Sequence, residues 1–153
     1  MGGGAEMEEN RTEGRKVPAL PDLFTWSEDG VHLLSARCGS CGTFFFPRYH
    51  EQHRPGCSRQ GIEKVLLSKG GKLSSYTIQY YMPPPPFKAD RDITPYVIGL
   101  VEFSEGIQIV GIVVDCPFDE LKMGMTMETT TFRLYRDEGG QDIVTWAFQP
   151  IKI

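Results

Sequence analysis

Alternating apolar and polar positions predict β-structure for most of the chain from residue 62 onward. Five segments rich in β-branched and aromatic residues follow one another with turn signals between them. They are the run from Val65 through Gly70-Gly71 to Tyr81, Tyr96 to Phe103, Ile107 to Val114, Thr126 to Arg136, and Asp142 to Phe148. This pattern predicts a five-stranded Greek-key barrel of the OB-fold type over residues 62–153. Gly99 and Gly111 lie inside two of these strands, where a bulge or tight bend requires a residue without a side chain.

The pattern differs toward the N-terminus. Residues 1–17 are glycine-rich and then charged, with almost no apolar content, which predicts a flexible tail. The next apolar residues recur at roughly helical spacing and are followed by a turn signal and a short apolar run. They are Leu20, Leu23, Phe24 and Trp26, then Asp29-Gly30, then Val31, Leu33 and Leu34. We therefore predict a short helix and a lead-in strand over residues 18–34.

Three cysteines and a histidine lie close together in residues 35–61. Cys38, Cys41, His53 and Cys57 form a Cys-x2-Cys-x11-His-x3-Cys pattern, in which two tight turns each supply two ligands. This spacing is typical of a tetrahedral zinc site, so we predict a zinc ribbon with structural zinc. A free or redox-active cysteine pair is the alternative. His50 is a rival ligand for His53, and we favour His53.

Aromatic residues are unusually dense in and before the ribbon. Phe44, Phe45 and Phe46 are consecutive, and side chains of a strand alternate between its two faces, so they cannot all point inward. At least one is expected to pack against the next domain or another chain. Together with Phe24 and Trp26 they form a predicted partner interface, with docking on this chain's own barrel as the alternative.

Two connections between the predicted strands stand out. Residues 82–95 are long for a barrel loop, and Pro83 to Pro86 should adopt a stiff polyproline II conformation that carries Phe87, Lys88 and Arg91 at its far end. The connection from Pro117 to Met125 predicts one helical turn that ends at Gly124.

Composition limits the classes of protein that fit. The formal net charge of −4 over 153 residues argues against a general nucleic-acid binder, which usually has a basic face. No apolar run is long enough to span a membrane, and the N-terminus has no secretory pattern. Four cysteines, three of them in the metal pattern, favour a reducing compartment, so we predict a cytoplasmic protein.

Several motifs occur in a fixed order over about residues 20–150. They are the cysteine knuckle followed by aromatics and proline, a glycine-rich hairpin, Ser74-Ser75-Tyr76-Thr77, Pro95-Tyr96-Val97-Ile98-Gly99-Leu100-Val101-Glu102, and Asp119-Glu120-Leu121-Lys122-Met123-Gly124-Met125. This combination resembles the acyl-CoA-associated OB-fold family with an N-terminal rubredoxin-like zinc ribbon. The family's usual metal pattern is two Cys-x2-Cys pairs. Here His53 occupies the third position and Cys57 the fourth, which indicates a Cys3His site.

The resemblance implies a non-catalytic small subunit that docks on a thiolase-fold protein. Members of the family serve thiolases, acyl-CoA-linked aldolases or acyltransferases. Within the family, the overall likeness points to thiolases of anaerobic aromatic degradation, of the benzoylsuccinyl-CoA type that acts in the toluene pathway. The resemblance therefore implies a hetero-oligomer that binds acyl-CoA, with the catalytic residues on the partner chain.

The residue chemistry is compatible with this role. Cys116 has no histidine near it in sequence, so a structural role is favoured over a nucleophile. Phe87, Lys88 and Arg91 are candidates for CoA binding, because CoA offers phosphates and an adenine to cations and aromatic rings. Solvated surface charge is the alternative for the two cations, and Arg48 and Arg54 in the ribbon are rival candidates.

A single-stranded nucleic-acid-binding OB module is the competing class. Zinc ribbons and OB barrels both bind single strands, and Tyr76, Tyr80 and Tyr81 offer rings on which bases stack. The acidic balance and the lack of a dense Lys/Arg groove argue against it, so we predict no nucleic-acid partner.

Overall fold

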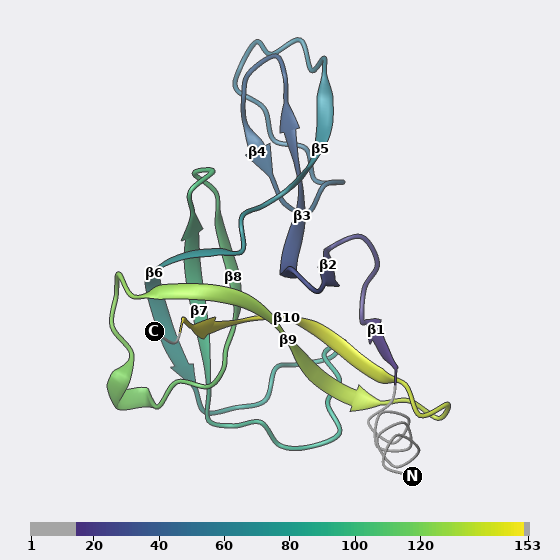
Figure 1. Cartoon of the computed structure of the whole chain (residues 1–153), viewed down its shortest axis with the longest axis vertical. Coiled ribbons are helices and arrows are strands. Elements are labelled where there is room, and N and C mark those ends of the chain that lie inside the picture. The colour runs from purple at the N-terminus through teal and green to yellow at the C-terminus, as the bar shows by residue number, and fades with distance from the viewer. Residues whose placement is uncertain (1–14, 152–153) are drawn as a thin grey trace.

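The computed structural model describes residues 15–151, and a five-stranded closed β-barrel forms its larger part (Figure 1). Its strands are β6 (Gly70–Gln79), β7 (Tyr96–Phe103), β8 (Gln108–Val113), β9 (Thr126–Arg136) and β10 (Asp142–Pro150). Neighbouring strands run antiparallel in the order β10-β8-β7-β6-β9, except that β10 and β8 are parallel, and the β9–β10 pair closes the ring. This is the pairing pattern of an OB-fold, so the predicted barrel is confirmed.

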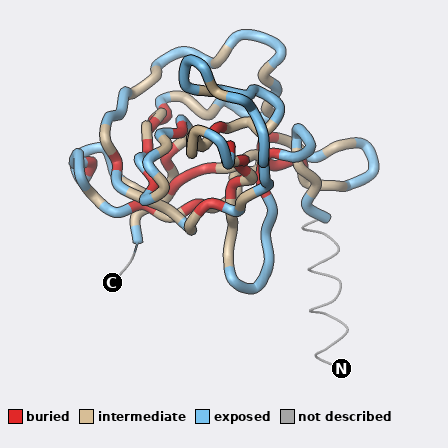
Figure 2. The backbone as a smooth tube through the Cα atoms, turned by 90° about the horizontal axis from the view of Figure 1, so that it is seen from above, coloured by how far each residue is buried: buried red, intermediate tan, exposed pale blue. Residues whose placement is uncertain are grey.

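Apolar side chains from alternate positions of these strands fill the barrel. Figure 2 shows the buried residues, in red, gathered along the strands at its centre. The barrel's largest buried side chains belong to Leu73, Val97, Val101, Phe103, Met127, Val144 and Phe148. Gly99 and Gly111 lie opposite each other on β7 and β8. A methyl group added at Gly99 would lie 2.7 Å from Val113, and one added at Gly111 would lie 2.7 Å from Phe148. Both glycines are therefore required by close packing inside the barrel.

A smaller antiparallel sheet forms the ribbon that projects from the barrel (Figure 1). Its strands are β2 (Phe24–Ser27), β3 (Gly30–Cys38), β4 (Phe44–Phe45) and β5 (Ile62–Leu66). β3 lies at its centre and pairs with each of the other three. β5 falls within the range expected for the barrel, yet it pairs with β3 from Leu34 to Cys38. The ribbon sheet therefore continues to Leu66.

The predicted helix within residues 18–34 is wrong. Residues 1–14 of the predicted tail lie outside the described residues, and the chain then enters the short strand β1 (Lys16–Pro18), which pairs in parallel with β10. Pro18 and Pro21 are three residues apart, and a proline inside a helix removes a backbone donor and clashes with the preceding turn. The helical spacing instead reflects docking of Leu23 and Phe24, which are buried in the barrel core cluster. The residues expected to form the lead-in strand lie within β3.

Helical structure within residues 15–151 is limited to one 3-10 turn, η1 (Phe118–Glu120). It lies in the connection where a single helical turn was predicted, and Gly124 follows it with φ +90°. No helix in this part of the chain is long and apolar enough to cross a membrane.

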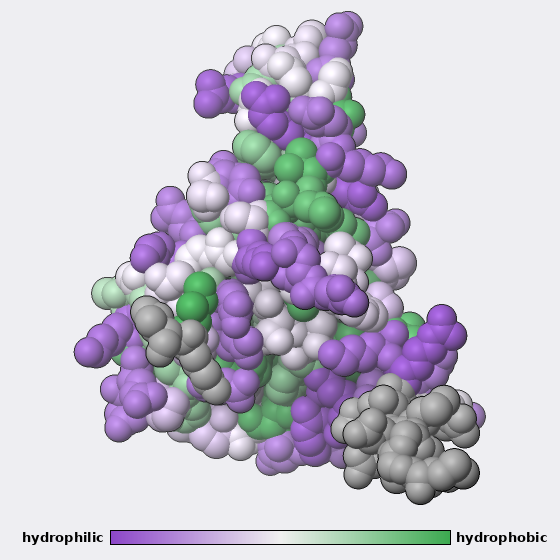
Figure 3. Space-filling model, in the orientation of Figure 1, coloured by the Kyte–Doolittle hydropathy of each residue, from purple (hydrophilic) through white to green (hydrophobic). Residues whose placement is uncertain are grey.

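Polar contacts fix the ribbon to the barrel at the linker between β5 and β6. The backbone N–H of Ser68 donates to Glu105 at 2.8 Å. The Nδ1 atom of His32 lies 2.8 Å from the carbonyl oxygen of Leu67, and Lys69 forms an ion pair with Asp29 at 3.0 Å. In Figure 3, hydrophobic side chains gather on one face over the region of β3 and β5, between the ribbon tip and the barrel. Exposed Ile62 and Leu66 belong to β5.

Candidate functional site: a metal centre in the ribbon and a cavity on the barrel

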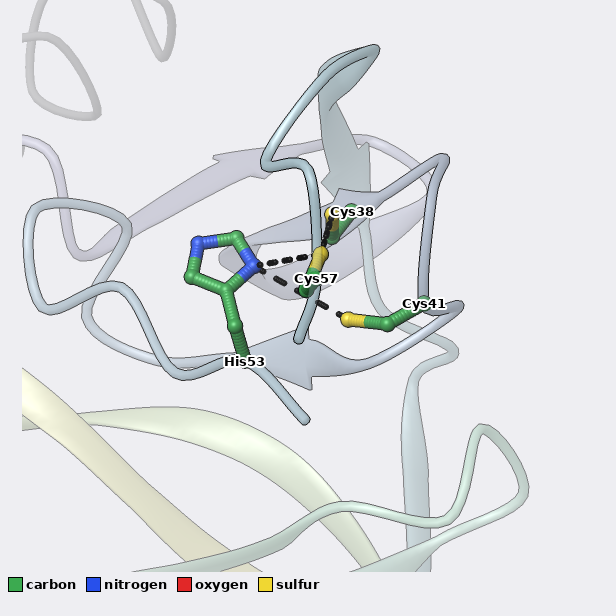
Figure 4. A group of neighbouring side chains, drawn as sticks. All are labelled: Cys38, Cys41, His53 and Cys57. Carbon is green, nitrogen blue, oxygen red and sulfur yellow. Dashed lines mark hydrogen bonds between the residues drawn. The ribbon is translucent and has the colours of Figure 1, made fainter. Parts of the chain in front are cut away.

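The ribbon brings the four predicted metal ligands together (Figure 4). Cys38 ends β3, Cys41 follows in a tight turn, and His53 and Cys57 lie in the long connection between β4 and β5. The turn closes through a 2.7 Å hydrogen bond from the Gly42 N–H to the Cys38 carbonyl, and the φ of +73° at Gly42 favours glycine. All four ligand atoms lie within 4.8 Å of one another.

The spacing of the ligand atoms fits a tetrahedral ion. The Sγ atoms of Cys38 and Cys57 are 3.5 Å apart, and the Nδ1 atom of His53 lies 3.5 Å from Cys57 Sγ and 3.8 Å from Cys41 Sγ. Zinc bonds of about 2.3 Å to sulfur and about 2.0 Å to nitrogen would place tetrahedral ligand atoms about 3.5–3.8 Å apart. The four side chains can therefore hold a metal ion, and the donor set is consistent with structural zinc.

Electrostatics at the site also favour a cation. The Thr43 hydroxyl, followed by backbone N–H groups, lowers the pKa of Cys41 to about 5, and the backbone N–H of Cys41 lowers the pKa of Cys38. The Arg59 N–H acts to lower the pKa of Cys57, but burial and the neighbouring thiols outweigh it and raise that pKa. Three thiolates side by side repel one another, so a bound divalent ion would stabilise all three.

A second layer of contacts orients the ligands. Glu51 Oε1 lies 2.8 Å from His53 Nε2, which leaves Nδ1 facing the sulfur atoms, and this carboxylate followed by Cys41 raises the pKa of His53 to about 8. His50, the rival ligand, is exposed and its ring packs against Tyr49. The structure therefore selects His53. A tetrahedral ion held by all four side chains would have no open position for a substrate.

The three residues predicted to bind CoA all lie in the long loop of residues 82–95, but their side chains lie in two different places. Phe87 and Lys88 line a cavity of about 400 Å³ on the outside of the barrel. Arg91 lies elsewhere: its guanidinium donates to the Arg133 carbonyl at 2.7 Å and the Leu134 carbonyl at 3.2 Å. Arg91 also pairs with Asp90 and lies over the Phe132 ring. Its polar atoms therefore fasten the loop to β9.

The cavity is mainly apolar and combines three segments that are distant in sequence. Its walls come from the N-terminal segment, the proline-rich loop, and strands β9 and β10. The principal residues are Leu20, Leu23, Phe24, Phe87, Tyr135 and Trp146. Lys88 also lines the cavity and brings a positive charge to it, with its Nζ atom 4.4 Å from the centre of the Tyr135 ring. Such a site fits an apolar or aromatic group that is joined to an anion.

Sequence reasoning missed Trp146 and Tyr135, which complete this cavity. Trp146 also donates from Nε1 to the Val110 carbonyl at 3.0 Å and borders a second cavity of about 260 Å³, which shares Phe87 and Thr145 with the first. An alternating strand pattern identifies both residues as strand positions. Their place beside the loop depends on the pairing of β9 with β10, which no local signal reveals.

The aromatic residues predicted as a partner interface pack within this chain to different degrees. Phe45 is buried in the ribbon core with Ala36 and Cys38, whereas Phe44 and Phe46 pack against the barrel core. Phe24 is 5% exposed, and Trp26 is 36% exposed. Phe46 meets Trp146 edge-on with ring centres 5.4 Å apart. Trp26 therefore keeps more surface available to a partner than Phe24 does.

Cys116 lies just after β8 and lacks the surroundings of a nucleophile. Burial, followed by the charges of Glu120 and Asp119, raises the pKa of its thiol. A nucleophilic cysteine needs the opposite shift. A structural role for Cys116 therefore fits its surroundings better than a nucleophilic one.

A zinc-type ribbon followed by an OB-fold barrel defines the class of protein, and comparison with known proteins gives the family. Residues 64–133 match the family model described as the C-terminal OB-fold domain of ChsH2. A DUF35 domain-containing scaffold protein of Methanocaldococcus jannaschii is 33% identical over 123 residues, covering 78% of this chain and 82% of the relative. The Methanothermobacter thermautotrophicus protein of the same description is 34% identical, covering 77% and 84%. This chain belongs to the family of DUF35 domain-containing scaffold proteins.

Two further similarities involve proteins with enzyme names. A solved structure titled Ltp2-ChsH2(DUF35) aldolase matches with a TM-score of 0.54 and 26% identity, covering 78% of this chain and 84% of that chain. A probable enoyl-CoA hydratase alpha subunit of Thermomonospora curvata is 30% identical over 119 residues, covering 72% of this chain but 34% of the relative.

Proposed function

We propose that this chain is a non-catalytic subunit that docks on a thiolase-fold enzyme and helps to complete its acyl-CoA site. The observation that carries the proposal is the cavity in which Phe87 and Lys88 meet Trp146, since its walls offer apolar contact and one cation. Relatives named as scaffold proteins, and one found in an aldolase structure, support a role beside an enzyme. The ribbon's metal, proposed to be zinc, stabilises the fold.

The ligand we propose for the cavity is a CoA thioester. CoA joins a flat adenine and a flexible pantetheine arm through phosphates, so it suits an apolar wall beside an ammonium group. Lys88 can reach a phosphate while Phe87 and Trp146 contact the uncharged parts. Arg91 would contribute indirectly, because it holds the loop against β9.

The thiolase class, and benzoylsuccinyl-CoA as its substrate, are the finer parts of the proposal and are supported by the sequence resemblance. A thiolase cleaves a carbon–carbon bond with the thiol of free CoA and yields two thioesters. An acyl-CoA aldolase is the second candidate partner, favoured by the aldolase title of the solved relative. A retro-aldol cleavage acts on a β-hydroxyacyl-CoA, yields an aldehyde or ketone and a shorter acyl-CoA, and needs no free CoA. The substrate and the requirement for free CoA therefore distinguish the two.

Reconstitution tests the proposal. The thiolase-fold protein that co-purifies with this chain is assayed alone and with the chain, using benzoylsuccinyl-CoA with and without free CoA. We expect cleavage that needs both chains and free CoA. A complex that leaves benzoylsuccinyl-CoA intact, and instead cleaves a β-hydroxyacyl-CoA without free CoA into an aldehyde or ketone and a shorter acyl-CoA, would identify an aldolase. Full activity of the enzyme without this chain would contradict the proposal.

Lys88→Ala tests the acyl-CoA contact within the complex. Loss of one charge-assisted contact, about 1 kcal/mol, should raise the Michaelis constant for acyl-CoA by about fivefold. Lys64→Ala, at an exposed position on β5, is the control and should leave the constant unchanged. Arg91→Ala should loosen the loop and lower stability as well. An unchanged Michaelis constant in Lys88→Ala and Arg91→Ala would rule out the role of the loop.

A nucleic-acid role remains the competing class, with Tyr80 and Tyr81 as its stacking surface. Both rings are well exposed, at 66% and 86%. The net charge of −4 favours the acyl-CoA role. A salt-dependent mobility shift with a single-stranded oligonucleotide would reverse this preference.

A further inference from the structure

One edge of β6 has no backbone partner along half of its length. β6 pairs with β7 from Gly71 to Gln79, but it pairs with β9 only from Gly70 to Lys72. Leu73 then exchanges hydrogen bonds with the loop after η1, through the Met125 carbonyl and the Gly124 N–H. From Ser75 to Gln79 no further backbone group in residues 15–151 pairs with this edge.

Two other strand edges of the barrel, which no barrel strand pairs with, are covered by other segments of this chain. β9 separates from β6 after its first residues, and there the Asp90 N–H and the Arg91 guanidinium bond to the carbonyl of Leu134. The first residues of β10 are covered by β1, and the Ala19 N–H donates to the Val144 carbonyl. Because an uncovered edge readily pairs with another strand, this contrast indicates that the β6 edge is kept open.

The sequence of the open stretch lacks the usual protection against pairing. Residues 73–82 contain no charged residue and no proline, and many are β-prone. Ser75, Tyr76 and Thr77 are exposed, and Tyr80 and Tyr81 follow them at the end of the strand. A bulge between Leu73 and Ser75 is the one protective feature, and it lies at the start of the stretch. Proteins normally place lysine or proline along such an edge.

We propose that this edge of β6 pairs antiparallel with the same edge of a second copy of this chain. A strand that meets its own copy across a twofold axis places identical charges close together, so a charged edge repels itself and an uncharged one does not. With the axis at Thr77, Ser75 lies opposite Gln79 and Tyr76 opposite Ile78. The tyrosines beside the pair supply the aromatic contact that is common in interfaces. Figure 1 shows β6 at the side of the barrel, away from the ribbon tip.

This self-association differs from the proposed function, since the Phe87–Lys88 cavity and the metal centre take no part in it. The self-paired strands would join two barrels into one ten-stranded assembly, with one ribbon on each copy. Each copy would keep its own cavity.

Sedimentation equilibrium of the metal-loaded full chain over a wide concentration range tests the proposal. We expect a monomer–dimer equilibrium, and Thr77→Lys should raise its dissociation constant about tenfold or more, because two lysines would face each other across the axis. Thr25→Lys adds the same charge at an exposed position on β2 and should leave the constant unchanged. Amide hydrogen exchange of the unmodified chain is a second test that does not depend on the variant folding. The protection of residues 75–79 against exchange should rise with protein concentration.

A chain that sediments as a monomer throughout the range overturns the proposal. Dimers that persist in Thr77→Lys, with no concentration-dependent protection of residues 75–79, also overturn it. If those amides become protected only when the partner enzyme is added, the edge serves the enzyme and self-pairing is excluded.

Discussion

The ribbon and the barrel are both antiparallel sheets, yet they are stabilised differently. Three buried residues, Ala36, Cys38 and Phe45, form the ribbon's own core. The cluster centred on the barrel contains 14 buried residues, enough to exclude water from a closed sheet. A domain with so small a core needs a further constraint, and a metal ion held by Cys38, Cys41, His53 and Cys57 would supply it in the ribbon. In the ribbon a bound metal would take the place of apolar burial, whereas the barrel is stabilised by its own core and carries a cavity on its outside.

Removal of a metal ligand is expected to have the largest effect and to separate the two regions. Cys57→Ser should lower metal affinity about a hundredfold or more, because a tetrahedral site loses one of its four ligands. Amide exchange should then accelerate over residues 35–60 while the barrel strands stay protected. Cys116→Ser is the matched control and should change neither quantity. Equal loss of protection in both regions would show that the barrel also depends on the metal.

Truncation in the barrel core should show the reverse pattern. Phe148 is fully buried and meets Phe103, so Phe148→Ala should lower the free energy of unfolding by about 3–5 kcal/mol. Metal content per folded molecule should stay the same. Urea unfolding and metal analysis measure the two quantities. Phe118→Ala, at a position 41% exposed, should cost about 0.5 kcal/mol or less. Loss of metal from folded Phe148→Ala would contradict independent stabilisation.

Phe46→Ala sharpens the comparison by weakening the contact between the two regions. Phe46 packs edge-on against Trp146, so its removal should cost about 1–2 kcal/mol of unfolding free energy in the metal-loaded protein. The cost should shrink after chelation, because an unfolded ribbon no longer holds Phe46 against the barrel. Tyr49→Ala, at a ribbon residue 62% exposed, is the control. An unchanged cost after chelation would place the effect of Phe46 inside the barrel alone.

The smallest expected effect concerns the loop that borders the cavity. Arg133, followed by Arg91, lowers the pKa of Asp90 from 3.8 to about 2. A carboxyl whose pKa is lower in the folded state adds stability above its unfolded pKa, and this stability is lost as pH falls from about 4 to about 2. Asp90→Asn should therefore lower the urea midpoint at neutral pH and converge with the unmodified protein near pH 2. A difference that is independent of pH would rule out the ion pair as its source.

The barrel strands were predictable because their signal is local. Alternation along Tyr96–Phe103 and the turn residues after it are read directly from the sequence, and the observed strands agree within a few residues. The cluster that could hold a metal ion was predictable for the same reason, since Cys38 and Cys41 share one turn. The choice of His53 over His50 rested on spacing, and Glu51 then fixes its ring.

The errors and omissions arise from contacts between distant segments. Leu23 and Phe24 follow a helical spacing, but they are buried against the barrel and the prolines before them prevent a helix. Trp146 joins the cavity only through strand pairing, and Arg91 turns its guanidinium to β9 because that edge is otherwise open. Neither arrangement follows from local pattern or composition.

The central claim is that the barrel cavity binds CoA while the ribbon binds only the metal. Titration of the zinc-loaded, isotope-labelled chain with CoA, followed by NMR, tests this claim most directly. We expect amide shifts to change around Phe87, Lys88 and Trp146, to weaken in Lys88→Ala, and to be absent at Cys38, Cys41, His53 and Cys57. Shifts that gather at the metal ligands, or no shift at any CoA concentration, would contradict the account.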